Sequence, residues 1–102
     1  MLPVKRIEII ANYVELAKIL EGLEKTGVEG CTVIRDVAGA STRSNSKHNL
    51  AMTMLDNVYI IAFCQPEKIT ATAEAIRGIL NKYGGSCFIS DAIELRTTRC
   101  VG

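Results

Sequence analysis

Val4-Lys-Arg-Ile-Glu-Ile-Ile10 opens the stretch that decides the fold of this chain. Ile7 and Ile9 alternate with polar residues, which is the pattern of a β-strand with one buried face. Beyond Asn12 the apolar residues recur at helical spacing, and Cys31-Thr-Val-Ile-Arg-Asp-Val37 returns to the branched residues that favour strands. Residues 4–37 therefore predict a strand, a helix and a second strand.

The first helix is expected between Asn12, whose side chain can cap a helix start, and Gly27, which favours a helix end. Its apolar residues recur every three or four positions, with charged residues on the opposite side. The expected buried face consists of Tyr13, Leu16, Ala17, Leu20 and Leu23, and the expected solvent face of Glu15, Lys18, Glu21 and Glu24.

The second half of the chain follows the same order. Val58-Tyr-Ile-Ile-Ala-Phe-Cys64 is apolar on both faces, as a central strand covered on each side would be. Gln65-Pro66 indicates a helix start, and the helix is expected to reach Gly84. Its expected buried face consists of Ile69, Ala73, Ile76, Leu80 and Tyr83. Residues 86–90 predict a fourth strand, and residues 92–97 predict a separate short edge strand.

Two strand-helix-strand units joined by a loop make a βαββαβ chain. This is the ferredoxin-like α+β arrangement of one antiparallel sheet with two helices on one face. With 102 residues, 48% of them hydrophobic, we expect a single domain over residues 1–102 with a tail at 97–102. Helices on one side leave an apolar sheet face on the other, which favours a closed symmetric oligomer.

Composition argues against several classes of function. Lys and Arg number 12 against 11 Asp and Glu, so the net charge of +1 does not favour binding to nucleic acid or anionic membranes. Four Cys and one His without a close cluster do not predict a metal site. No apolar run approaches the roughly 18 residues of a spanning helix, and the N-terminus lacks the apolar region of a signal peptide. We therefore expect a cytoplasmic protein with reduced thiols.

Residues 38–57 form an expected long loop between the second and third strands, and a loop of this length in a small domain is functional or disordered. Its first part combines small residues, hydroxyl groups and cations, which together can bind a phosphate group. The residues concerned are Gly39, Ala40, Ser41, Arg43 and Lys47. Two interpretations remain, a solvated mobile loop and a phosphate-binding loop. Arg96 and Arg99 add a second basic group able to hold phosphate oxygens.

Isolated reactive residues are weaker candidates. His48 lies in the polar loop without an acidic neighbour, so a surface histidine is favoured over a general base. Cys31, Cys64 and Cys87 lie in strand patterns and are expected to be packed core thiols. Cys100, next to a basic residue, is the one thiol that suits a redox or disulfide role.

Two stretches resemble the PII signal-transduction superfamily. Leu23-Glu-Lys-Thr-Gly27-Val-Glu-Gly30-Cys-Thr32-Val33 resembles the exit of its first helix and its second strand, where Gly-x-x-Gly-x-Thr-Val is typical. Ala92-Ile-Glu-Leu-Arg96-Thr97 resembles its closing strand. The resemblance extends over nearly the whole chain in order and length, and residues 38–57 correspond to the T-loop of that superfamily.

The resemblance implies a homotrimer of ferredoxin-like subunits whose sheets face inward. It also implies adenine nucleotides bound between subunits, and a T-loop that changes with the nucleotide and docks onto transporters or enzymes. Gly30, Thr32 and Val33 would then lie near the adenine, with Phe88 also at the nucleotide. Gly39, Ala40, Ser41, Arg43 and Lys47 would lie near the phosphates, which Arg96 would bind. Glu94 stands where an arginine is common, and Arg99 is the residue that would compensate.

Departures from the superfamily pattern narrow the expectation. Residues 38–57 contain no Tyr, so the uridylylation of nitrogen-sensing members is not expected. Asn81-Lys-Tyr-Gly-Gly-Ser86 replaces a glycine-rich segment with a phosphate-gripping lysine, so a strong ATP and 2-oxoglutarate site is not expected either. The chain resembles instead the PII-like branch near bicarbonate transporters or carboxysome genes, which responds to AMP, ADP or cyclic AMP and in some members binds bicarbonate.

The sequence thus favours a non-enzymatic signalling protein that binds AMP or ADP, with bicarbonate as a further ligand, and regulates inorganic-carbon uptake through its T-loop. No metal or resident cofactor is expected, and no nucleic acid. Two alternatives stay open. One is a small ferredoxin-like enzyme that uses His48 or a Cys. The other is a metal-tolerance trimer of the CutA type that binds copper through His48, Met52, Met54 or a Cys.

Overall fold

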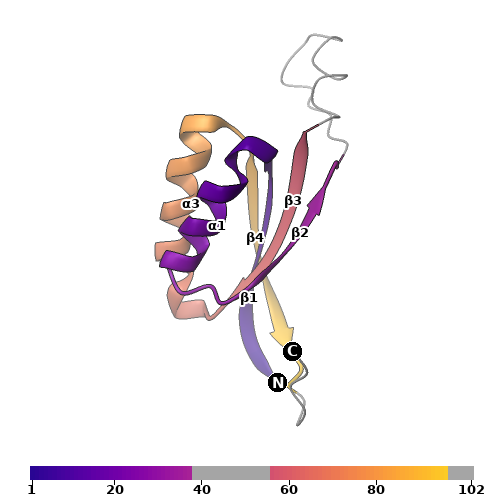
Figure 1. Cartoon of the computed structure of the whole chain (residues 1–102). Helices are drawn as coiled ribbons and strands as arrows, with labels where there is room; N and C mark the ends of the chain where they lie inside the picture. Colours follow the sequence, from indigo (N-terminus) through magenta and orange to yellow (C-terminus); the bar gives the residue numbers. More distant parts are fainter. Residues whose placement is uncertain (38–55, 97–102) are drawn as a thin grey trace.

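The computed structural model describes residues 1–37 and 56–96. Four strands form one antiparallel sheet in the order β2-β3-β1-β4, and two helices lie side by side on one of its faces (Figure 1). In chain order the elements are β1 (Leu2–Asn12), η1 (Tyr13–Glu15), α1 (Leu16–Lys25), β2 (Cys31–Arg35), β3 (Asn57–Cys64), η2 (Pro66–Lys68), α3 (Ile69–Tyr83) and β4 (Ser86–Glu94). The predicted ferredoxin-like α+β fold is therefore confirmed. None of the helices in these two stretches has the length and apolar character needed to cross a bilayer.

Local signals placed the ends of the first helix correctly. The side chain of Asn12 accepts a hydrogen bond from the backbone N–H of Val14 at 3.0 Å, as the predicted cap requires. Gly27 follows α1 with a φ of +91°. Glycine adopts this backbone conformation readily because it has no Cβ atom. The second strand ends at Arg35 and not at Val37 as predicted, because Asp36 turns the chain out of the sheet with a φ of +59°.

The buried faces of both helices agree in part with the predicted ones, since Leu23 and Ile76 are buried and Leu16, Ile69 and Leu80 pack against the core. Ile19 and Leu23 are the fully buried residues of α1, and Thr72 and Ile76 are those of α3. Contrary to the prediction, Tyr13, Ala17 and Tyr83 are exposed, and Glu15 is buried. Each helix begins with a 3-10 turn, η1 or η2, which has three residues per turn where an α-helix has 3.6. Tyr13 and Glu15 lie in such a turn and therefore do not continue the spacing of α1.

The core lies between the helices and one face of the sheet. On β1 and β3 the side chains of Ile7, Ile9, Val58 and Ile60 point toward α1 and α3 and are almost completely buried. On the opposite face of β3, Tyr59 and Ile61 are half-buried and Phe63 is exposed. The prediction that β3 is buried on both faces is therefore not met within one chain, because both helices cover the same face.

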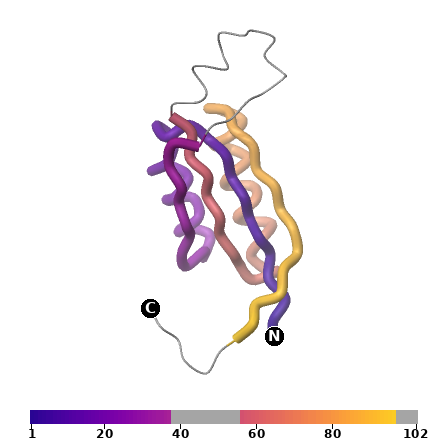
Figure 2. The backbone as a smooth tube through the Cα atoms, turned by 90° about the vertical axis from the view of Figure 1, so that its right-hand side faces the viewer, coloured from indigo at the N-terminus to yellow at the C-terminus, as the bar shows by residue number. Residues whose placement is uncertain are grey.

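The end of the chain forms one strand where two were predicted. β4 runs without a break from Ser86 to Glu94 and pairs with β1 in antiparallel register, from Ile10 opposite Ser86 to Leu2 opposite Glu94. β1 begins at Leu2, before the predicted start, so residues 92–94 find a partner in the same ladder. The start of β1 and the end of β4 lie side by side at the end of the sheet that extends beyond the two helices (Figure 2).

A hydroxyl pair joins the end of α1 to the start of α3. Thr72 is fully buried, and its Oγ1 lies 3.0 Å from Oγ1 of Thr26 and 2.9 Å from the carbonyl oxygen of Lys68. Thr26 in turn donates to the carbonyl oxygen of Gly22 at 3.0 Å. This contact holds the loop after α1 against η2, and both segments border a hollow of the described chain.

We expect Thr72→Val to lower the free energy of unfolding by about 1 kcal/mol, because valine keeps the shape of the side chain but leaves the Thr26 hydroxyl without its buried partner. Urea unfolding followed by circular dichroism measures the change. Thr70→Val, at an exposed position of the same helix, is the matched control and should change stability little. Equal effects of the two substitutions would contradict the assigned contact.

Candidate functional site

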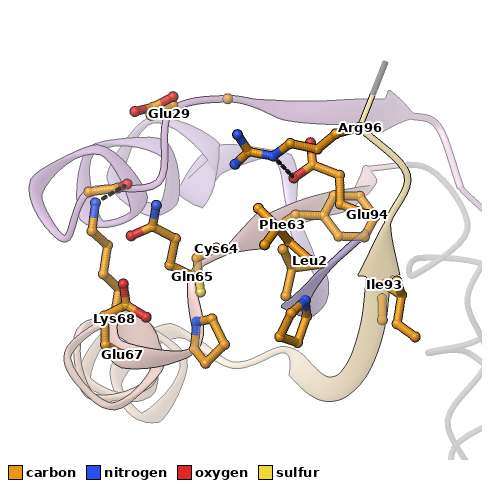
Figure 3. A pocket seen from close by; sticks show the side chains of 16 residues that line it. Leu2, Glu29, Phe63, Cys64, Gln65, Glu67, Lys68, Ile93, Glu94 and Arg96 are labelled. Atoms are coloured by element: carbon orange, nitrogen blue, oxygen red, sulfur yellow. Dashed lines mark hydrogen bonds and ion pairs between the residues drawn. The ribbon is translucent and has the colours of Figure 1, made fainter. Parts of the chain in front are cut away.

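A hollow of about 810 Å³ lies at the end of the sheet where β1 begins and β4 ends. Its walls come from four segments that are far apart in the sequence: residues 2–4, 27–30, 63–68 and 92–96. Figure 3 shows Leu2 and Phe63 on one side of the hollow and Glu29, Gln65 and Lys68 on another. The hollow therefore combines an apolar wall with a polar one, the usual composition of a small-molecule site.

Arg96 extends from the end of β4 into this space, with its guanidinium group on the side of Glu29 and Gln65 (Figure 3). Its Nε lies 3.8 Å from Oε1 of Glu94, and both side chains are more than half exposed. An ion pair that is long and exposed contributes little stability, so the guanidinium group can exchange its partner at small cost. Its planar set of donors suits the oxygens of a phosphate or carboxylate group.

Lys68 is the second cation of the hollow. Its Nζ donates to the carbonyl oxygen of Gly27 at 3.4 Å, and no carboxylate in the described parts of the chain lies within 4.0 Å of it. A Cβ added at Gly27 would lie 2.9 Å from that Nζ, so the glycine leaves room for the lysine side chain. Lys68 also precedes α3, where the helix dipole disfavours a positive charge. Its charge is therefore available to an anion.

A second hollow of about 530 Å³ lies against the first. Both are bordered by Gly27, Glu29, Gly30 and Lys68. The rest of its wall is largely apolar and consists of Leu20, Leu23, Glu24, Val28 and Cys31. Lys68 thus lies between the two spaces.

The model of the family described as nitrogen regulatory protein P-II matches residues 4–99. The chain belongs to this family. The match also includes residues 38–55, which lie between the described stretches of the structure. The resemblance stated from the sequence is therefore confirmed.

Solved structures of PII-like proteins share the fold. CPII, a nitrogen regulatory PII-like protein from Thiomonas intermedia K12 solved with ADP, AMP and bicarbonate, is 23% identical, with 92% of this chain and 90% of that chain covered at a TM-score of 0.76. Its apo form is 21% identical, with coverage of 93% and 95% and a TM-score of 0.75. A PII-like signalling protein from Thermus thermophilus is 13% identical, with coverage of 89% and 87% and a TM-score of 0.69. No curated protein matches the chain.

In this P-II chain, the structure brings together two of the residues expected at a nucleotide, Gly30 and Arg96, at the same hollow. Thr32, Val33 and Phe88 do not line it. The hollow lies at the end of the sheet, whereas these three residues belong to the bodies of β2 and β4. Several further candidates lie outside the described residues: Gly39, Ala40, Ser41, Arg43, Lys47, His48, Arg99 and Cys100.

Sequence reasoning missed Leu2, Glu29, Phe63, Gln65 and Lys68 as lining residues. Four of the five belong to strand or loop patterns that carry no mark of a site. The exception is Lys68, because a positive charge in the first turn of a helix is disfavoured by the helix dipole. Such an unfavourable position is a signal of a functional role. The residues around it were interpreted only as a helix start.

The cysteines of the described chain are free thiols. Cys64 is buried and Cys87 half-buried, and in each case burial raises the pKa of the thiol. The prediction that Cys31 is a packed core thiol is wrong, because β2 is an edge strand and leaves this residue exposed. Residues 1–37 and 56–96 also contain no group of three or more His, Cys, Asp or Glu side chains placed to hold a metal ion.

Proposed function

We propose that the chain is a non-enzymatic, cytoplasmic adenine-nucleotide sensor that works as a homotrimer and binds AMP or ADP in the clefts between subunits. The observation that carries this proposal is the 810 Å³ hollow in which Gly30 and Arg96 meet. Family membership supports it, as does the presence of ADP, AMP and bicarbonate in the related CPII structure. The hollow supplies one wall of the cleft, and a neighbouring subunit supplies the other.

The chemistry of the hollow suits a mononucleotide. Its volume lies within the roughly 300–1,000 Å³ of most ligand pockets. Leu2 and Phe63 offer an apolar surface to a base, Arg96 offers paired donors to a phosphate, and Lys68 adds a second positive charge. In the same proposal Thr32, Val33 and Phe88 contact the nucleotide from the neighbouring subunit.

The regulatory output is assigned to residues 38–57, the T-loop of the family. Arg43 and Lys47 contact phosphate in one state of this loop, together with Gly39, Ala40, Ser41 and Arg99. A ligand shifts a segment only by its difference in affinity for the two states, so these contacts must be made in one state and lost in the other. The loop then binds a membrane transporter or a carbon-metabolism protein, such as a bicarbonate transporter or a carboxysome component, with bicarbonate as a co-ligand.

The enzyme and copper-binding alternatives gain no support from the described residues. Burial raises the pKa of Cys64 and Cys87, which keeps these thiols protonated at neutral pH and therefore poor nucleophiles. His48, which both alternatives use, and Met52 and Met54, which only the copper-binding alternative uses, lie outside the described residues.

Isothermal titration with AMP, ADP, ATP and cyclic AMP, each with and without bicarbonate, tests the proposal after light scattering has given the mass of the assembly. Micromolar binding of AMP or ADP to a trimer, strengthened by bicarbonate, is the expected result. Absence of binding by every nucleotide would overturn the sensor function and leave the P-II fold unaffected.

We expect Lys68→Met to weaken AMP or ADP binding about fivefold, which corresponds to about 1 kcal/mol, because the variant keeps the side-chain length and removes only the charge. Titration calorimetry measures the change. Lys82→Met, which removes an exposed charge at the C-terminal end of α3, the opposite end from Lys68, is the matched control and should leave the affinity unchanged. A loss of affinity in both variants would point to a general electrostatic effect and would remove Lys68 from the site.

A further inference from the structure

Figure 2 shows the sheet face that the helices leave uncovered. A cluster of polar side chains from β1, β3 and β4 lies on this face. Arg6 and Glu8 project from β1 on this face, and Nε of Arg6 lies 3.0 Å from Oε1 of Glu8. The same Nε donates to Oγ of Ser90 at 3.1 Å, and the hydroxyl of Tyr59 donates to Oε2 of Glu8. The bond to Glu8 raises the pKa of Tyr59, so its hydroxyl remains a donor at neutral pH.

Apolar side chains surround this cluster. Phe63 on β3 is paired with Arg6, and Phe88 on β4 is paired with Glu8. The two phenyl side chains are 50% and 63% exposed, and Ile34 on the edge strand is 49% exposed. Large exposed side chains gathered on one sheet face mark an interaction surface, because their transfer from water to a partner is favourable.

The bonding of Arg6 is incomplete. Within the described chain only its Nε is bonded, which leaves the four N–H donors of its two terminal nitrogens, and the side chain is 45% exposed. A partner that covered this face with apolar side chains alone would strip water from those donors and leave them unpaired, which is costly. The occupant must therefore bring hydrogen-bond acceptors to Arg6, of which a carboxylate forms the strongest bonds, and apolar surface to Phe63 and Phe88.

A second copy of the chain meets both requirements. In the structure Oε2 of Glu8 accepts one hydrogen bond and Oε1 makes only an ion-pair contact, so the carboxylate has capacity for further bonds. In a closed ring of copies, one contact between unlike patches repeats from each copy to the next until the ring closes. We propose that Arg6 of one copy pairs with Glu8 of the next, and that this ring of ion pairs fixes how the sheets align. The inference rests on the proposed homotrimer and names the residues that set the alignment of its subunits.

Charge reversal tests the inference with native mass spectrometry and light scattering. Arg6→Glu gives each copy two acids at the contact and Glu8→Arg gives it two bases, so each variant alone should be monomeric. An equimolar mixture should recover mixed trimers, in which two of the three contacts join opposite charges. A pairing confined within each chain could not be repaired by mixing, so absence of mixed trimers would overturn the inference.

Two controls separate the possible failures. Lys25→Glu reverses a charge in an exposed pair on α1 and should leave the trimer mass unchanged. A monomeric wild type would contradict the proposed homotrimer itself, whereas a trimeric wild type with trimeric Arg6→Glu and Glu8→Arg variants would overturn only the ion-pair ring.

If either charge reversal prevents folding, Arg6→Met and Glu8→Gln are tested instead. Each should raise the concentration at which trimers dissociate by about tenfold, and an unchanged value would overturn the inference.

Discussion

Arg96→Ala is expected to weaken the binding of AMP and ADP by roughly 10- to 100-fold, the largest effect that a single side chain should have on the proposed function. Arg96 lines the 810 Å³ hollow and is held only by a long pair with Glu94, so its donors are available to a phosphate group. Isothermal titration of the variant against wild type measures the change.

Two further variants give this prediction its control. Arg77→Ala removes an exposed arginine of α3 that pairs with Glu74 at 3.2 Å, and should leave the affinity unchanged. Arg96→Lys keeps the charge but loses the planar pair of donors, and should give an intermediate affinity. Wild-type affinity in Arg96→Ala would exclude Arg96 from the nucleotide site.

Gly85→Ala should lower the free energy of unfolding by about 3 kcal/mol, the largest stability loss expected from a single methyl group in this chain. Gly85 has a φ of +123°, and an added Cβ would lie 2.8 Å from the carbonyl oxygen of Ile10. Both the backbone of β1 and the turn before β4 would have to move, which would disturb the start of the β1–β4 ladder. Urea unfolding followed by circular dichroism measures the loss.

Gly84→Ala is the matched control for that substitution. Gly84 also has a positive φ, +89°, but an added Cβ there would meet no atom within 4 Å. Its ψ of 168° places it in a backbone region that is essentially restricted to glycine, so the substitution should cost backbone strain of about 1–2 kcal/mol and no steric contact. If the two variants lost the same stability, steric contact with Ile10 would be excluded as the cause of the effect at Gly85.

The two glycines also illustrate how far local patterns reach. A pair of glycines after a helical stretch predicts a helix end, and α3 does end at Tyr83. Only the tertiary structure separates them, because the carbonyl oxygen that crowds Gly85 belongs to β1, far away in the sequence. The buried position of Glu15 does not follow from helical spacing, because this residue lies in the 3-10 turn before α1, where the period of an α-helix does not apply.

The candidate site was predictable only in part. Gly30 and Arg96 were named from the sequence because they lie in stretches that resemble the PII superfamily. Lys68 and Gln65 were not, since neither a motif nor a period marks them, and they acquire meaning only beside residues of other segments. The nucleotide-site candidates on the loop and the tail lie outside the described residues and stay predictions.

The sequence by itself determined the order of strands and helices, the cap at Asn12, the antiparallel α+β class and the presence of a sheet face that the helices leave uncovered. These features follow from the periodicity and residue preferences of short stretches, which act within a few residues. The tertiary structure alone decided the length of β4, the hollow beside Arg96 and Lys68, and the bonds of Arg6 to Ser90 and of Glu8 to Tyr59. Each of these depends on which distant segments are placed side by side, and the contact is set by the packing of the whole sheet rather than by any one stretch.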